Sequence, residues 1–238
     1  MRKAFLLACV LFLHAPFLEA QEKDPSSVRV QAGFNVGFNS SLLIISDVAS
    51  SFQSIADYQN AYRIGYFGSF FLRISARNLF FQPELSLGRT QCASVIYLPS
   101  DREQTTMGTP SDLECSLFSL DLPFLVGYNV IRSGSCTMGL MMGPRLRGIL
   151  DANSRLTNRE RILEEYEIDE SIHRLTLGLT LGLSVTIDRV YFDFRYDVGL
   201  HDINRLATAY PVSPDSGLPS VRYHRRQNVL SFSVGAIF

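Results

Sequence analysis

Ten charged side chains alternate with apolar residues along this chain. Within each segment they share one parity, so in extended backbone they would project to one side. Six are arginines and four are carboxylates, a set suited to ion pairs, to a narrow polar pathway or to a proton-conducting chain. The ten are Arg29, Arg63, Arg73, Glu84, Asp121, Arg145, Arg147, Asp193, Arg195 and Asp197. Because unpaired charge is costly in an enclosed space, we expect mainly a packed Arg–carboxylate network.

Catalytic and metal-binding chemistry has weaker support. His201 and Asp202 are adjacent, and His173 and His224 lie in neighbouring segments, where they could serve an enzyme. No matched serine or paired-aspartate pattern accompanies them, and no cluster has the ligand spacing of a metal site. The net charge of -1 argues against a nucleic-acid binder. We therefore expect no enzymatic activity, no cofactor, no metal and no nucleic-acid partner.

Short segments of strict alternation must position these side chains. From Leu175 to Val185, leucines and a valine alternate with Thr, Gly and Ser, and the same spacing of two recurs from Val190 to Leu200. A helix would need apolar residues three or four apart, so the pattern predicts strands with one apolar face. We expect eight strands, near residues 28–38, 62–74, 79–90, 115–130, 136–149, 173–187, 190–201 and 227–238.

The connections between these strands alternate in length. Tight turns are predicted at residues 76–78, 132–135 and 187–189, and long loops at 39–61, 91–114, 150–172 and 202–226. An outer-membrane barrel has this asymmetry, with short periplasmic turns and longer extracellular loops. The predicted fold is therefore all-β: an eight-stranded antiparallel transmembrane β-barrel with up-and-down meander topology.

The distribution of charge orients the two faces. The apolar face carries no charge over residues 30–38, 64–72, 79–87, 118–128, 138–146, 175–185, 190–200 and 230–238. A basic residue that faced lipid at the midplane would cost about 2–4 kcal/mol. We expect the apolar face to meet lipid and a polar, Gly-rich face to line the lumen. The alternative is a soluble lipocalin-like barrel with the bulky face inward. Eight strands leave an interior that those Leu and Phe side chains would overfill.

Both ends of the sequence carry signals of outer-membrane biogenesis. Arg2 and Lys3 precede an apolar run over residues 4–13, and Ala20 before Gln21 suits a signal-peptidase cut. We expect a signal peptide at 1–20, a short periplasmic segment at 21–27 and a barrel domain at 28–238. The last strand alternates through Phe232 to Phe238 and resembles the strand by which the barrel-assembly machinery recognises its clients.

Three cysteines follow the predicted signal peptide. Cys92 ends the third predicted strand and Cys115 begins the fourth, so both flank the second long loop and point inward. Cys136 begins the fifth strand at the other end of the barrel, beyond the roughly 7 Å between Cα atoms that a disulfide allows. We predict a Cys92–Cys115 disulfide, since the compartment is oxidising.

Short motifs in the expected strands resemble a known family. They are Val30-Gln31-Ala32-Gly33-Phe34-Asn35, Phe81-Gln82-Pro83-Glu84-Leu85, Leu120-Asp121-Leu122-Pro123 and Gly143-Pro144. They resemble the PorT-like outer-membrane β-barrel family of Bacteroidota-type bacteria, from about residue 28 to 238. The resemblance implies an eight-stranded barrel in the outer membrane of a Gram-negative bacterium. Asp121 stands where that family more often has Glu.

The expected function is that of a non-enzymatic structural or interaction protein with surface-exposed loops. The alternatives are an accessory component of a protein-secretion or envelope-assembly system, by family analogy alone, a narrow solute channel, and an outer-membrane enzyme. Expected partners are outer-membrane lipid, lipopolysaccharide, the barrel-assembly machinery during biogenesis, and secretion-system or surface proteins.

Overall fold

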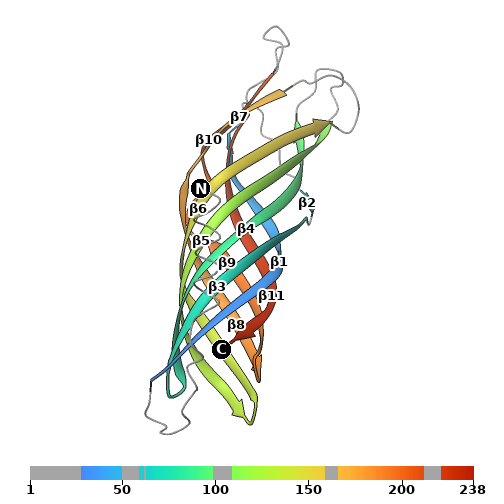
Figure 1. The fold of residues 1–238 in the computed structure, drawn as a ribbon. Helices are drawn as coiled ribbons and strands as arrows, with labels where there is room; N and C mark the ends of the chain where they lie inside the picture. The colour runs from blue at the N-terminus through green and yellow to red at the C-terminus, as the bar shows by residue number, and fades with distance from the viewer. Residues whose placement is uncertain (1–27, 50–58, 62, 99–108, 159–165, 212–220) are drawn as a thin grey trace, which may run out of the picture.

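The chain forms a closed antiparallel β-barrel (Figure 1). The computed structural model describes residues 28–49, 59–61, 63–98, 109–158, 166–211 and 221–238. Eight strands follow one another around the barrel, and pairing of the first with the last closes it. They are β1 (Arg29–Ala49), β3 (Ile64–Ala76), β4 (Leu79–Leu98), β5 (Thr109–Ser133), β6 (Cys136–Asn158), β8 (Leu175–Ile187), β9 (Val190–Gly199) and β11 (Val221–Ile237). The predicted fold class is confirmed.

Tight turns join three of the hairpins at one end of the barrel. The turns are Arg77-Asn78 between β3 and β4, Gly134-Ser135 between β5 and β6, and Asp188-Arg189 between β8 and β9. The first residue of each has φ near +55°, the left-handed conformation that two-residue hairpins favour because it matches strand twist. All three coincide with predicted turns.

Most strands continue far beyond their predicted ends, away from the tight turns. β5 has 25 residues and β6 has 23, whereas crossing a bilayer takes about 9–11. Much of the predicted loops 39–61, 91–114 and 150–172 is therefore strand. The expectation was wrong because it ended each strand where apolar alternation stopped. Outside the bilayer, a strand keeps its backbone pairing without an apolar outer face.

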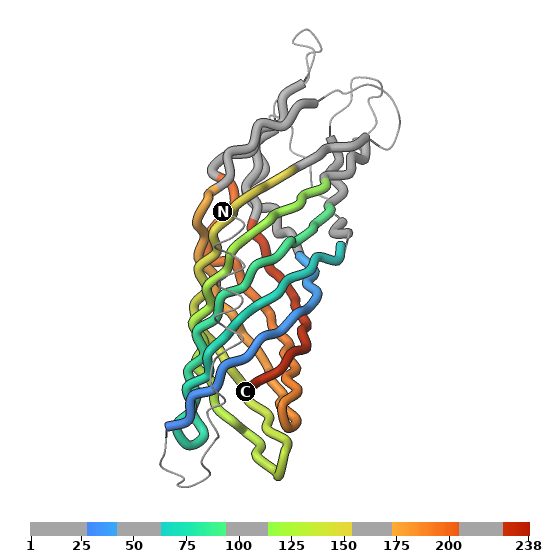
Figure 2. Tube along the Cα trace, viewed as in Figure 1, coloured from blue at the N-terminus to red at the C-terminus, as the bar shows by residue number. Residues whose placement is uncertain are grey.

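Three short strands complete the sheet at this end. β2 (Gln59–Ala61) pairs with β4, while β7 (Tyr166–Ile172) pairs with β10 (Asn204–Pro211), which in turn pairs with β11. Figure 1 shows β7 and β10 at the upper end of the barrel, and the tube in Figure 2 shows the described strands winding obliquely around the barrel. At the end opposite the tight turns, the sheet is therefore extended in two places: by β2 beside β4, and by β10 and β7 beside β11.

The two faces of the wall differ as predicted. Bulky apolar side chains point outward, among them Phe70, Val36 and Leu140, which are 70%, 56% and 55% exposed. Such exposure over a whole belt is suited to lipid and excludes the lipocalin-like arrangement. Within the described ranges, no helix has the length and apolar character needed to cross a membrane.

Candidate functional site: the charge network of the lumen

One ion cluster bridges the lumen from β4 to β9, which lie on opposite sides of the barrel. Arg195 on β9 donates two hydrogen bonds to Glu84 on β4, Nη1 to Oε1 at 2.9 Å and Nη2 to Oε2 at 2.8 Å. The same guanidinium forms an ion pair with Asp193, which also accepts a hydrogen bond from Tyr191 Oη at 3.1 Å. All four side chains are buried. A bidentate Arg–carboxylate pair of this kind fixes two distant strands relative to each other.

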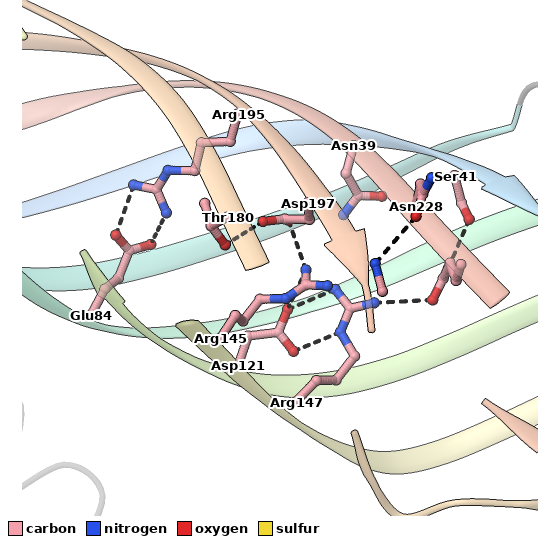
Figure 3. Close-up of polar contacts among 12 residues, drawn as sticks. Asn39, Ser41, Glu84, Asp121, Arg145, Arg147, Thr180, Arg195, Asp197 and Asn228 are labelled. Carbon is pink, nitrogen blue, oxygen red and sulfur yellow. Dashed lines mark hydrogen bonds and ion pairs between the residues drawn. The ribbon is translucent and has the colours of Figure 1, made fainter. Parts of the chain in front are cut away.

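A second ion cluster lies nearer the long-loop end (Figure 3). Arg147 on β6 holds Asp121 on β5 in a bidentate pair, with Nε–Oδ1 at 2.9 Å and Nη2–Oδ2 at 2.7 Å. Arg145 Nη1 donates to Asp197 Oδ2 at 2.7 Å and lies 3.8 Å from Asp121 Oδ2. Thr180 Oγ1 donates to the other oxygen of Asp197 at 2.5 Å. Each carboxylate of this cluster therefore faces at least one arginine.

Uncharged side chains extend the second cluster across the lumen. Arg147 Nη1 donates to Gln227 Oε1 on β11 at 3.0 Å, and Gln227 Nε2 donates to Ser41 Oγ on β1 at 2.8 Å. The chain of contacts thereby runs from β5 through β6 and β11 to β1. Neither Gln227 nor Ser41 stood out in the sequence, because a lone polar residue on the inward face resembles its neighbours.

The buried charges balance within the described lumen. Four arginines and four carboxylates of the predicted ten are enclosed: Arg73, Arg145, Arg147, Arg195, Glu84, Asp121, Asp193 and Asp197. Arg29 and Arg63 are not among them, which corrects the prediction. Arg29 is exposed at the start of β1, and Arg63 precedes β3 and pairs with Glu114 in a half-exposed ion pair. The alternation of inward and outward side chains does not predict the direction of these two residues, because each lies at or beyond the end of a strand.

Apolar side chains form a floor across the lumen at the tight-turn end, which the sequence analysis missed. Phe71, Tyr191 and Ile237 make one buried cluster. Phe80, Leu125 and Met141 make the other. The floor is defined by these six residues. The lumen is therefore not polar along its whole length, contrary to the expectation.

Arg73 joins the floor to the charges above it. Its guanidinium carbon lies 4.4 Å from the centroid of the Phe80 ring and 5.0 Å from that of Tyr191, within cation–π range. Its Nε donates to Gln82 Oε1 at 2.8 Å. This arginine is thus held by aromatic faces and an amide, whereas the other three buried arginines have direct carboxylate partners.

Glycine was the sequence signal for the floor. Phe71 is the register partner of Gly33, Phe80 of Gly127 and Tyr191 of Gly235. A Cβ at Gly33 or Gly127 would collide with the ring of its Phe partner. An inward aromatic residue fits a narrow barrel only where the neighbouring strand leaves room, so paired Phe and Gly on inward positions indicate a plug.

An apolar cap covers the network at its other end. Cys92, Cys115, Leu117, Ile149 and Ile203 form this buried cluster, which is called the cap below. Leu117 and Ile149 lie two or more residues beyond Asp121 and Arg147 on the same strands, so the cap follows the second ion cluster directly. A cavity of about 40 Å³, lined by side chains of both ion clusters, lies between floor and cap. It has room for about three or four water molecules, by the roughly 10–15 Å³ that each requires.

The remaining predicted residues fall in several places. Cys92 and Cys115 are direct register partners, and Cys92 Sγ donates to the carbonyl oxygen of Cys115 at 3.6 Å. Their disulfide stays a prediction. Phe232 and Phe238 point outward, and Phe238 stacks on Phe34 with 6.1 Å between ring centroids. The predicted signal residues Ala20 and Gln21 lie outside the described residues.

The histidines do not assemble into a described site. His201 is exposed, and Asp202 beside it lies 3.5 Å from Arg226 Nε. The side chain of His224 lies outside the described part of the chain. Among the described residues, no group of three or more His, Cys, Asp or Glu side chains is placed to hold a metal ion.

Comparison with known proteins agrees with this architecture. The model of a family described as "Outer membrane protein beta-barrel domain" matches residues 19–205. OprG from Pseudomonas aeruginosa resembles the structure with a TM-score of 0.54 and 12% identity, over 91% of this chain and 99% of that chain. Neisserial surface protein A gives 0.37 and 11%, over 88% and 98%. Ail of Yersinia pestis gives 0.35 and 9%, over 88% and 99%. No curated protein matches the chain, and the comparisons do not confirm the PorT-like assignment.

Proposed function

The chain belongs to the outer membrane protein β-barrel domain family, and we propose that it is a plugged, non-enzymatic scaffold which presents its extracellular sheet to a binding partner. The barrel spans the outer membrane of a Gram-negative bacterium. The observation that carries the proposal is the closed lumen. A protein whose barrel interior is filled has only its outer surface and its extracellular end with which to act.

Three consecutive layers support closure. The floor blocks the lumen with Phe71, Phe80 and Tyr191, which are at most 3% exposed. The two ion clusters above it connect opposite walls, and together with Arg73 their formal charges sum to zero. The cap then covers them on the extracellular side. Because four arginines meet four carboxylates, the network needs no mobile ion to neutralise it, and a permeating ion would have to break buried pairs.

The extracellular extension supports a role in binding. A 25-residue strand such as β5 is roughly 80 Å long at about 3.3 Å per residue, more than twice what a tilted bilayer crossing needs. Such an extension does not help to anchor the barrel. It does carry the far ends of β4, β5 and β6 well clear of the membrane surface, where another protein can reach them.

Conductance in planar lipid bilayers tests closure. The folded protein, with insertion verified by its heat-dependent shift in gel mobility, is expected to give no unitary current steps above the bilayer background. Reproducible unitary steps from the folded band would overturn the plugged scaffold and favour the channel. The heat-denatured protein is the matched control for leakage caused by aggregates.

Affinity purification from outer membranes tests the binding role. The intact chain is compared with a variant in which residues 99–108 and 159–165 are replaced by Gly-Ser segments of equal length. We expect a partner that the intact chain retains and the variant loses. If that partner is a secretion component, the accessory role is supported; equal recovery with both chains would contradict recognition through these segments.

A further inference from the structure

We propose that Cys92 and Cys115 form a disulfide that crosslinks β4 to β5 beside the extracellular end of the membrane-spanning barrel. The two residues are direct partners in the antiparallel register. Cα atoms of such partners lie about 4.5–5.5 Å apart, within the range of roughly 4.4–6.8 Å that disulfides occupy. Both side chains point inward, with exposures of 2% and 3%.

The thiol of Cys92 also approaches the backbone of Cys115. Cys92 Sγ lies 3.6 Å from the carbonyl oxygen of Cys115, so the side chain of Cys92 is turned toward the opposite strand. The flanking pairs Gln91–Ser116 and Ala93–Glu114 keep the same register, which leaves no slippage between the cysteines.

Cys136 is excluded as the partner of either residue. It begins β6 beside the Gly134-Ser135 turn, with Ser133 and Ile187 as register partners. Cys115 and Ser133 belong to the same strand and are 18 residues apart, roughly 60 Å at 3.3 Å per residue. The barrel therefore selects one of the three possible pairings.

Oxidation requires an electron acceptor, which we assign to the disulfide of a periplasmic thiol oxidoreductase. The thiolate of one cysteine attacks that disulfide to give a mixed disulfide, and the second thiolate displaces the enzyme. The S–S bond formed here replaces the one broken in the oxidoreductase. Two protons and two electrons leave the cysteines, and the oxidoreductase becomes a dithiol.

Burial dictates when this exchange takes place. Both cysteines belong to the cap, where Leu117, Ile149 and Ile203 pack around them. Ile149 comes from β6 and Ile203 from the segment after β9, so the cap is complete only when those parts have assembled. An oxidoreductase cannot reach a thiol enclosed in this way. The cysteines are 23 positions apart, so the bond can form in the β4–β5 hairpin before the barrel closes.

Tryptic mapping of the protein from outer membranes tests the pairing. Each cysteine lies on its own tryptic peptide: residues 90–102, 103–132 and 133–145. After alkylation in denaturant without reductant, we expect the first two peptides to be linked and Cys136 alkylated. Alkylation of both Cys92 and Cys115, or a link from either to the 133–145 peptide, would overturn the proposal. The Cys136→Ser variant should retain the link.

Reduction of the folded barrel tests the timing. Dithiothreitol is added to the folded protein and to protein unfolded by heating in detergent, and the linked peptide is followed over time. We expect reduction to be at least about tenfold slower in the folded barrel, because the thiolate must reach the buried sulfur atoms. Equal rates would refute oxidation before closure while leaving the pairing itself intact.

Discussion

Replacing Asp121 by Asn tests whether the buried ions stabilise one another. The substitution keeps the size of the side chain but removes the negative charge that Arg147 holds at 2.7 and 2.9 Å. Arg147 then retains Gln227 as its acceptor, and Arg145 loses its second carboxylate. Breaking a buried ion pair by removing one partner costs about 3–5 kcal/mol, since it leaves an uncompensated charge. We expect the free energy of unfolding to fall by that amount.

The combined variant Asp121→Asn, Arg147→Met removes both members of one pair. It leaves three arginines and three carboxylates in the lumen, so the formal balance is restored. We expect the double variant to lose about 2–3 kcal/mol less of its free energy of unfolding than the sum of the two single losses. Arg147→Met alone leaves Asp121 with Arg145 at 3.8 Å, so it should be the milder of the two single substitutions.

Urea titration followed by gel electrophoresis without boiling is the suitable assay. The chain has no Trp, so the folded fraction is read from the heat-modifiable band rather than from Trp fluorescence. Glu114→Gln is the matched control, because it makes the same chemical change in the half-exposed pair with Arg63 and should cost no more than about 1 kcal/mol. The reasoning is refuted if the free energy of unfolding of Asp121→Asn lies within about 0.5 kcal/mol of the parent's value. It is also refuted if the loss in the double variant equals the sum of the two single losses.

Three further substitutions test the floor, the lipid face and a turn. Gly127→Ala places a Cβ against the Phe80 ring and should cost about 1–3 kcal/mol by urea titration, whereas Gly68→Ala on the lipid face should be neutral. Phe70→Arg puts a charge on the lipid-facing side and should cost about 2–4 kcal/mol when folding is measured in lipid vesicles; a value near zero would contradict the assigned orientation. Arg77→Gly relieves a φ of 55° and should stabilise the barrel by up to about 1 kcal/mol, and a loss of stability would mean that the arginine side chain matters more than the backbone.

The sequence predicted the wall of the barrel well because mistakes of parity are energetically severe there. Arg145 and Arg147 flank Leu146, and only one phase of that alternation keeps both charges out of lipid. The structure buries both arginines. The tight turns were equally predictable, since each lies between two alternating segments whose spacing leaves only two residues to reverse the chain.

The pairing of the charges could not be read from the sequence. Glu84 and Arg195 are 111 residues apart. Which inward-facing residues of opposite strands meet across the lumen depends on the stagger of all the strands between them. The positions at which the strands end were predicted wrongly for a different reason. The apolar alternation marks the bilayer, whereas β5 and β6 are held together by backbone hydrogen bonds well beyond it.

Charged rather than apolar side chains fill this lumen. The reason is that an outer-membrane protein must first be exported across the inner membrane. If inward positions such as Asp193 and Arg195 were apolar, β8 and β9 (residues 175–199) would form an apolar stretch of 25 residues, broken only by the Asp188-Arg189 turn, within a chain that must first cross the inner membrane. A long enough apolar stretch is retained there as a helix, so alternation has to be kept. Polar inward residues must then find partners in a lumen too narrow for bulk water: uncharged groups need hydrogen bonds, and charged groups need a neighbouring opposite charge. The floor and the cap confine those pairs to the middle of the barrel, where protein rather than solvent surrounds them. A filled, neutral lumen is thus the consequence of combining export with eight strands.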